Sequence, residues 1–411
     1  MFSVFITLQL SGSVIYRGLK EFSDGKKFIS AATGLMLTSS LASALVYFLL
    51  FPLFKKITGL SLLLSALLFF EAFLNGIRAL RLSEAKFFYR YKICVFESAF
   101  FALITPILSI LFIKLGYAGA LSRIYAHIIV SLLFAASILF FVIKSSHFYL
   151  FSAPVWRFLI KYALPSLPHF LSISLIFQIG KISVGRFFGE SDAALLSIST
   201  SVGFLPSLFT QGALSALLPW VNRKLAEDGG KEKIYTLTLS LILPLTLLVL
   251  LFLCFCPEAM LVIAPKSYSP ALAAIYPIAA ATVFTFLINL FSSMISYYKK
   301  TYFVTLGSVF GAFIALILNF TLTARLGFVF AAFAELFATI SILIIYSIIL
   351  KKRFKHQALP ASKLALYSLL LIVGATALFY LSHSLPARLI FSIAIILSLI
   401  PSIKRAAAFI K

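Results

Sequence analysis

Apolar segments of about 20 residues recur along the whole 411-residue sequence, and they constrain the fold more than any other feature. A segment of that length can cross the hydrocarbon core of a bilayer as an α-helix. Hydrophobic residues make up 62% of the chain and charged residues only 11%, too few polar residues to cover a water-soluble globule. The sequence therefore predicts an all-α polytopic membrane protein with about 13 transmembrane helices. The thirteen predicted segments are 1–16, 30–53, 60–82, 93–113, 118–143, 158–180, 193–220, 234–256, 270–297, 303–324, 328–350, 364–382 and 386–403.

The connections between these segments are short, and none is long enough to hold a soluble catalytic domain. The sequence has no G-x-x-x-x-G-K-[ST] stretch, so we expect no ATPase of its own. Its three cysteines lack the spacing of a metal site and are expected to be small buried hydrophobic residues. We therefore expect neither an enzyme active site nor a metal.

The cations are unevenly distributed among the connections. One alternate set of loops carries 26 of the 35 Lys and Arg residues, and the positive-inside rule places that set in the cytoplasm, together with the C-terminus. Topology and contact with anionic membrane lipids account for most of these cations, so no nucleic-acid partner is expected. The set comprises 17–27, 78–92, 144–161, 222–233, 299–300, 351–363 and 404–411.

The first segment begins apolar at Met1 and has no flanking cations to orient it. Thirteen helices with an internal C-terminus put the N-terminus outside. We expect a plan of fourteen helices in which the first is absent from this sequence. A signal peptide is the alternative, but it requires a basic start and a small-residue cleavage site.

Two pairs of matching stretches predict an internal repeat. "KLGYAGA" at 114–120 matches "RLGFVFA" at 325–331, and "RGLKEFSDGKKF" at 17–28 matches "RKLAEDGGKEKI" at 223–234. The offset spans six helices, an even number, so both copies have the same orientation in the membrane. Two parallel lobes with a site between them favour alternating-access transport, and duplication for structure alone is the alternative.

The repeat sets the expected domains. Residues 1–144 form an N-terminal lobe of five helices and 145–157 a cytoplasmic linker. Residues 158–350 form a C-terminal lobe of six helices, and 351–411 add two more.

Three stretches resemble the Wzx-type polysaccharide (O-antigen) flippases of the multidrug/oligosaccharidyl-lipid/polysaccharide (MOP) exporter superfamily. "YALPSLPHFLSISLIFQIGKISVGRFFG" at 162–189 resembles that family's seventh helix and following loop. "SYSPALAAIYPI" at 267–278 and "LNFTLTARLGFVFAAFAE" at 318–335 resemble its tenth helix and its eleventh-to-twelfth turn. Two positions depart from the pattern, because Gly180–Lys181 replaces an acid followed by Arg and "LLSIS" replaces a Gly-x-Tyr-Ser element.

The resemblance implies a flippase in the bacterial cytoplasmic (inner) membrane. Its cargo would be polyprenyl-diphosphate-linked oligosaccharide for O-antigen, capsule or exopolysaccharide. Polysaccharide polymerase and glycosyltransferases would be its partners. Related alternatives are a multidrug exporter and a lipid II flippase. A membrane glycosyltransferase or polymerase, or an acyltransferase built on His127 or His169, is a more distant alternative.

A polar headgroup needs a polar path, and three residues of the third segment could line one. Glu71, Asn75 and Arg78 follow at i, i+4 and i+7 and share one face of a helix. Such a stripe is expected to avoid lipid. A snorkelling Arg78 with a locally paired Glu71 is the alternative.

Charged residues of the two lobes could also meet across a cleft. Arg123 and His127 share a helical face, and Glu335 lies at a similar depth after the equivalent turn of the other lobe. We hypothesise that Arg123 and Glu335 approach each other in one conformation, with a local pair or no contact as the alternative.

The remaining candidates are cations at helix ends, carboxylates and amides. Lys181 and Arg186 are expected beside the outer end of the sixth segment, and Arg17 and Arg223 at matched cytoplasmic ends, where topology signalling also explains them. No cofactor is expected beyond coupling to a proton or Na⁺, which Glu71, Glu97 or Glu335 could bind. Amides could contact sugar hydroxyls or hydrogen-bond neighbouring helices, namely Gln178, Gln211, Asn289 and Asn319.

Overall fold

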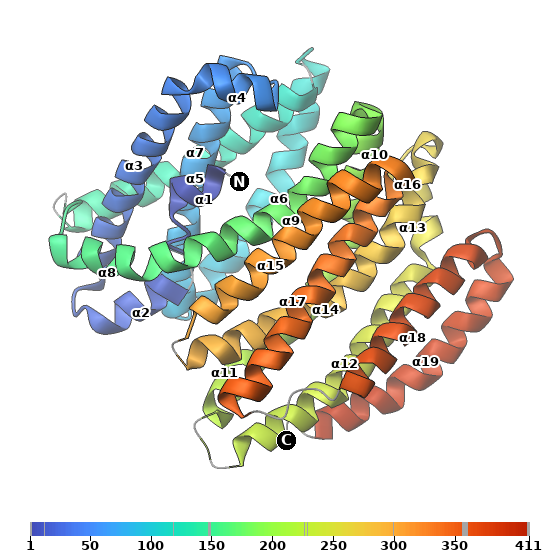
Figure 1. Ribbon diagram of the computed structural model, residues 1–411. Coiled ribbons are helices and arrows are strands. Elements are labelled where there is room, and N and C mark those ends of the chain that lie inside the picture. Colours follow the sequence, from blue (N-terminus) through green and yellow to red (C-terminus); the bar gives the residue numbers. More distant parts are fainter. Residues whose placement is uncertain are drawn as a thin grey trace. The chain divides into compact units, whose positions relative to one another are not determined.

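Every regular element that the structure describes is helical (Figure 1). The computed structural model describes residues 2–11, 13–117, 119–146, 149–225, 227, 229–298, 300–355 and 361–408. Within these residues, ten helices are long and apolar enough to cross a membrane, or up to eleven if a bent pair counts as one span. The predicted all-α polytopic fold is confirmed.

The chain divides into two compact units, Met1–Leu171 (unit 1) and Ser172–Lys411 (unit 2). Unit 1 contains α1 (Phe2–Thr7), α2 (Ser13–Glu21), α3 (Gly25–Leu49), α4 (Phe51–Thr58), α5 (Leu62–Phe87), α6 (Tyr91–Lys114), α7 (Gly119–Ser146), α8 (Ala153–Ala163), η1 (Leu164–Ser166) and the start of α9 (Leu167–Phe188). Unit 2 contains the rest of α9, α10 (Glu190–Gly203), α11 (Ser207–Lys224), α12 (Gly230–Cys254), α13 (Cys256–Ile263), η2 (Lys266–Ala271), α14 (Leu272–Tyr297), α15 (Tyr302–Leu318), η3 (Asn319–Thr323), α16 (Ala324–Leu326), α17 (Val329–Phe354), α18 (Ala361–Tyr380), η4 (Leu381–His383) and α19 (Leu385–Ala408). The expected boundaries at 144, 157 and 350 stay a prediction.

The first predicted segment, 1–16, is not one continuous helix. Leu8 and Gln9 have φ of 47° and 48°, in the left-handed region, and they separate α1 from α2. Non-glycine residues rarely adopt this conformation, because their Cβ atoms meet the backbone. The segment 193–220 is also interrupted, since α10 and α11 meet at an angle of 43°.

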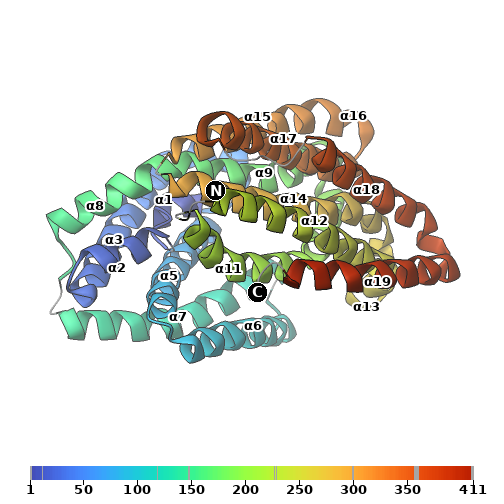
Figure 2. The ribbon, with the colours of Figure 1, turned by 90° about the horizontal axis from the view of Figure 1, so that it is seen from below.

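Helix α14 forms the centre of unit 2. In the candidate span Lys266–Tyr297, 83% of the apolar window is buried, against 17% for Lys92–Lys114 in unit 1. Small residues at Ala279, Ala280 and Ala281 allow neighbouring helices to approach α14 closely, as is typical of membrane helix packing. The views in Figures 1 and 2 show α12, α17 and α18 around it.

The glycine of the repeated loop has a similar φ in both copies. Gly116 follows α6 with φ of 90°, and Gly327 follows α16 with φ of 92°. Glycine adopts this region without steric cost, so each copy of the cation–Leu–Gly–aromatic pattern has glycine where the chain leaves a helix with positive φ.

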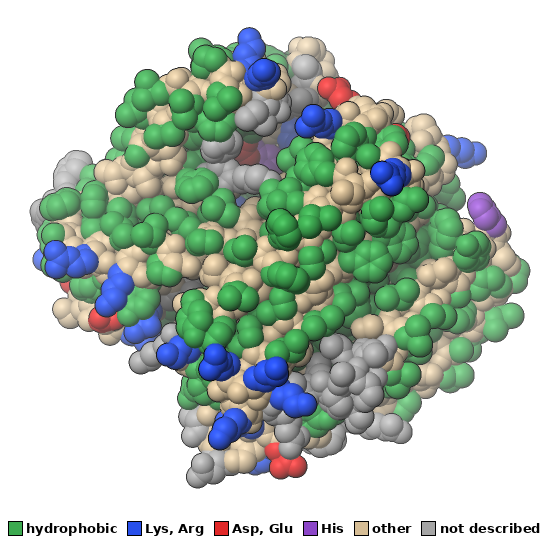
Figure 3. All heavy atoms as spheres, in the orientation of Figure 1, with side chains coloured by type: hydrophobic (Ala, Val, Ile, Leu, Met, Phe, Trp, Pro, Cys, Tyr) green, Lys and Arg blue, Asp and Glu red, His purple; other side chains and the backbone are tan. Residues whose placement is uncertain are grey.

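Loops of the predicted cation-rich side meet at one end within each unit. In unit 2, the Lys231 ammonium donates to the Phe354 carbonyl (3.0 Å), and the rings of Tyr298 and Phe354 stack with centroids 4.5 Å apart. Figure 3 shows Lys and Arg side chains gathered where α17 ends and α12 begins. In unit 1, Arg17 lies over the Tyr162 ring of α8 at 4.2 Å, directly after the 144–161 segment.

The close approach of α15 and α17 gives a stability test. A methyl group added at Gly311 would lie 2.4 Å from Ile342 Cγ1 and 3.3 Å from the Ala338 carbonyl oxygen. We expect Gly311→Ala to destabilise the protein by about 1–3 kcal/mol through overpacking, measured by thermal unfolding of the purified protein in detergent. Gly212→Ala is the matched control, because nothing lies within 4 Å of its added methyl group. Equal unfolding temperatures of the two variants would show that α15 and α17 do not pack this closely.

Candidate functional site

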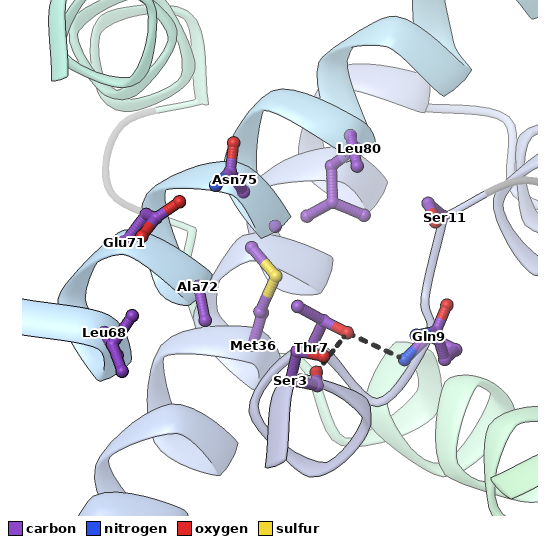
Figure 4. Close-up of a pocket in the computed structure, with 12 residues that line it drawn as sticks. Ser3, Thr7, Gln9, Ser11, Met36, Leu68, Glu71, Ala72, Asn75 and Leu80 are labelled. Carbon is purple, nitrogen blue, oxygen red and sulfur yellow. Dashed lines mark hydrogen bonds between the residues drawn. The ribbon is translucent and has the colours of Figure 1, made fainter. Parts of the chain in front are cut away.

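A polar cavity of about 400 Å³ lies inside unit 1 (Figure 4). It is an open hollow, bordered by α1, the α1–α2 connection, α3 and α5. Two of the predicted path residues, Glu71 and Asn75, line it from α5. The polar stripe of this helix therefore faces a cavity at these two positions, and its role as a substrate path stays a prediction. The polar groups that line the cavity are Ser3, Thr7, Gln9, Ser11, Glu71 and Asn75.

The break between α1 and α2 builds the other wall of this cavity. The Thr7 hydroxyl donates to the Ser3 carbonyl (2.8 Å), and the backbone N–H of Gln9 donates to Thr7 Oγ1 (3.3 Å). The second bond gives the backbone N–H of Gln9 a partner at the point where the helix is interrupted. Strained, left-handed residues concentrate at functional sites, so the break favours a binding role for this wall.

Two side chains of α7, His127 and Arg123, lie near Glu71. His127 Nδ1 on α7 lies 3.3 Å from Glu71 Oε1, and both side chains are mostly buried. Arg123, one turn earlier on α7, is exposed and lies within electrostatic range of both groups. The predicted shared face of Arg123 and His127 is therefore directed toward Glu71.

Asn75 and Arg78 make contacts that fix the rest of the stripe. The Ser131 hydroxyl donates to Asn75 Oδ1 (3.3 Å), which ties α5 to α7. The Arg78 guanidinium lies 4.1 Å from the centre of the Phe101 ring on α6, a cation–π geometry. Glu97 is buried, lies within electrostatic range of Arg78, and its Oε1 has no hydrogen-bond partner among the described residues.

The lining of the cavity is less basic than the sequence suggested. Among the described lining residues, Glu71 is the one charged side chain, and Arg78 and Arg123 lie outside the lining. The other polar groups are hydroxyls and amides. The cavity can therefore exchange hydrogen bonds with a neutral, hydroxyl-rich group. The cations Arg78 on α5 and Arg123 on α7 lie outside its lining.

Lys181 and Glu335 lie within electrostatic range of each other, in unit 2. Lys181 lies within α9, seven residues before its end, rather than in the exposed loop that we expected. Glu335 on α17 is 7% exposed, lies within electrostatic range of Lys181, and its Oε1 accepts no hydrogen bond from the described residues. Glu335 thus has a candidate partner in its own unit. The hypothesised approach of Glu335 to Arg123 would be a contact between unit 2 and unit 1, and it stays a prediction.

Asn319 lies beside this pair, in a π-helical turn that ends α15. Its Oδ1 accepts from the hydroxyls of Ser183 (3.1 Å) and Thr323 (3.3 Å), and its Nδ2 donates to the Ala315 carbonyl (2.9 Å). Short π-helical segments occur preferentially at functional sites. Every polar atom of this amide is used internally, which favours the role of hydrogen-bonding neighbouring helices.

The other predicted residues are not gathered into either site. Arg17 and Arg186 are exposed near the ends of α2 and α9, and Asn289 is half-buried within α14. Arg223 is exposed at the end of α11, near Glu227, whose carboxyl pKa is lowered mainly by a hydrogen bond from Lys224 (2.6 Å). Within the described part of the chain, no group of three His, Cys, Asp or Glu side chains is placed to hold a metal ion.

Sequence reasoning missed the N-terminal wall of the cavity. Ser3, Thr7 and Ser11 recur at i, i+4 and i+8, a polar stripe like that of α5, and Gly12 follows them. That spacing was a usable signal. The left-handed break at Leu8 and Gln9 had no comparable signal, because neither residue type favours it.

Comparison with known proteins gives a fold. No protein-family model matches the chain, and no curated protein matches it either. The lipid II flippase MurJ, in an inward closed conformation, has a TM-score of 0.68 at 17% identity, over 99% of this chain and 92% of that one. A multidrug resistance MATE family transporter of the MOP superfamily, outward-facing, has a TM-score of 0.61 at 15% identity, over 87% of this chain and 84% of that one.

A third solved structure is a MOP superfamily transporter from Pyrococcus furiosus, with a TM-score of 0.60 at 15% identity, over 87% of this chain and 85% of that one. At these identities the likeness shows that the chain has the fold of MOP superfamily transporters. The polysaccharide-specific part of the predicted resemblance goes beyond it.

A double-mutant cycle tests the pair between Glu71 and His127. We expect Glu71→Gln and His127→Gln to be non-additive by about 0.5–3 kcal/mol in the free energy of unfolding, because each removes the partner of the other. Lys27 and Asp24 are the control pair, since both are exposed to solvent and should give nearly additive effects. Additivity at Glu71 and His127 would mean that the pair does not form.

A charge swap tests the pair in unit 2. Lys181→Glu and Glu335→Lys should each lower the unfolding temperature, because each leaves two like charges near a buried site. The double variant restores the attraction and should recover at least half of that loss. No recovery in the double variant would exclude a direct pair, and recovery only with Arg123→Glu would favour the contact between the two units.

Proposed function

We propose that this protein is a flippase that moves polyprenyl-diphosphate-linked oligosaccharide from the inner to the outer leaflet of the cytoplasmic membrane by alternating access. The observation that carries the proposal is the polar cavity inside an otherwise apolar helical unit. A headgroup that crosses hydrocarbon about 30 Å thick needs such a path, whereas the polyprenyl chain can stay in lipid. A purely structural cavity would have little reason to collect strained backbone and six polar lining residues.

The chemistry of the lining suits a saccharide. Hydroxyl and amide groups donate and accept hydrogen bonds without carrying charge, as sugar hydroxyls do. The volume of about 400 Å³ lies within the usual range of ligand pockets, roughly 300–1,000 Å³. Gln9 and Asn75, on opposite walls, are the side chains that we assign to sugar hydroxyls.

The cations behind the cavity suit the diphosphate. Arg78 and Arg123 are near enough to the cavity wall to act electrostatically on Glu71 or its neighbours. Outward movement of an anion gains about 2.3 kcal/mol per charge per 100 mV of an inside-negative potential. No nucleotide is then required, and a proton or Na⁺ bound at Glu71, Glu97 or Glu335 would provide further coupling.

The fold likeness to a lipid II flippase supports this reading. The cargo that we propose is an O-antigen, capsule or exopolysaccharide unit. The C-terminus and the cation-rich loops would lie in the cytoplasm, and glycosyltransferases and a polysaccharide polymerase would act before and after the transfer. Lipid II itself is an alternative cargo of the same chemical class.

A second candidate function is export of organic cations. The observation that favours it is the charge of the lining, since Glu71 is the one ionisable lining group among the described residues. A carboxylate in a low-dielectric cavity attracts a cation and repels a diphosphate.

Reconstituted vesicles separate the two functions. We expect the wild-type protein to move a polyprenyl-diphosphate oligosaccharide to the outer leaflet, measured as the rate at which an external glycosidase gains access to it. Gln9→Ala and Asn75→Ala should each slow this rate about tenfold, because each removes a hydrogen-bond partner worth ~1–3 kcal/mol.

Leu45→Ala on α3 is the control, since that side chain is 62% exposed on the apolar surface and should keep the wild-type rate. Uptake of ethidium without movement of the lipid-linked sugar would replace the proposal by the cation exporter.

A further inference from the structure

A second hollow, of about 300 Å³, lies at one end of unit 2, far along the chain from the polar cavity. Helix α13 and η2 form one wall, and the turn between α18 and α19 forms the other. It lies at the end of α12 opposite to Lys231. The polar and charged residues that line it are Glu258, Lys266, Ser269, Ser382, His383 and Arg388.

Arg388 holds the two walls together. Its side chain is 5% exposed and makes two hydrogen bonds to the Glu258 carboxylate, at 2.5 and 2.7 Å. It also donates to the Cys254 carbonyl at the end of α12 (2.5 Å). These hydrogen bonds lower the pKa of Glu258, so the carboxylate stays ionised and its negative charge is neutralised by Arg388. Arg388 Nε is buried and lacks a hydrogen-bond partner in the described residues.

The hollow therefore has a surplus of positive charge at its mouth. Lys266 and His383 are both exposed there, and neither has an ion-pair partner among the described residues. With Glu258 and Arg388 neutralising each other, Lys266 contributes one uncompensated positive charge. The hydroxyls of Ser269 and Ser382 add two hydrogen-bond donors. This lining complements a singly charged anion.

An exposed apolar surface adjoins the hollow. Leu261, Val262 and Ile263 at the end of α13 are 66%, 88% and 56% exposed. A short apolar helix end followed by a lysine is typical of segments at the boundary between hydrocarbon and headgroups. A free phosphate ion would need no such surface, whereas the acyl chains of a lipid would cover it.

We propose that this hollow binds the phosphodiester headgroup of an anionic membrane phospholipid. Lys266 pairs with the phosphate, the two serine hydroxyls donate to it, and the acyl chains lie on Leu261, Val262 and Ile263. The bound lipid links α13 to the α18–α19 turn and so stabilises the C-terminal pair of helices on α12. The site serves the stability of unit 2 and is independent of the proposed cargo.

Lipid-dependent thermal stability tests this site. We expect phosphatidylglycerol, added to the purified full-length protein in detergent, to raise the unfolding temperature by about 2–4 °C at saturation. Phosphatidylcholine should raise it by less than half as much. In Lys266→Gln the difference between the two lipids should disappear. Lys55→Gln, which removes an exposed cation from α4 in unit 1, is the control and should keep the full difference.

Three outcomes would overturn the site. An unchanged lipid difference in Lys266→Gln would place the bound lipid elsewhere. An equal effect of the two lipids, or none from either, would exclude selection for an anionic headgroup. The same shift produced by inorganic phosphate alone would identify a free anion, rather than a lipid, as the ligand.

Discussion

Hydrocarbon offers no hydrogen-bond partner to a peptide group, and this absence determines how the chain can fold. Each backbone N–H and C=O inside the membrane must be satisfied within the chain, so every regular element that the structure describes is a helix. The same requirement makes an interrupted helix informative. Where α1 stops at Thr7, its hydroxyl accepts a hydrogen bond from the backbone N–H of Gln9, and the polar cavity lies beside this break. At α1, a deviation from regular helix therefore adjoins the candidate site.

Charged side chains follow the same logic. Two of them lie beside polar or aromatic groups, Glu71 beside the His127 imidazole and Arg78 over Phe101. Burying an ion without compensation costs several kcal/mol, so each such group marks a position where its cost is offset by function or by a local partner. Glu335 is the clearest example, because it is buried and its Oε1 has no hydrogen-bond partner among the described residues. A carboxylate with a spare acceptor is what a coupling cation would use.

The sequence predicted the fold well because its strongest signal is hydrophobic length. The parallel repeat was visible in a seven-residue pattern, since Gly116 and Gly327 must both adopt positive φ after a cation and a leucine. Two of the cavity's lining residues, Glu71 and Asn75, could be placed on one face of a helix from their spacing. Arg78 shows the limit of that argument. It belongs to the same stripe, but its guanidinium turns to Phe101 on a neighbouring helix, a contact that no periodicity encodes. Lys181 likewise lies within α9 rather than beyond it, because helix ends depend on caps that the apolar pattern locates only to within a few residues.

The distribution of lipid-linked glycan in cells tests the central claim most directly. In a strain from which this protein is deleted, the account predicts that polyprenyl-diphosphate oligosaccharide accumulates on the cytoplasmic leaflet while its synthesis continues. Expression of the protein from a plasmid should return the glycan to the outer leaflet. An unchanged distribution between the leaflets, with the surface polysaccharide intact, would contradict the account.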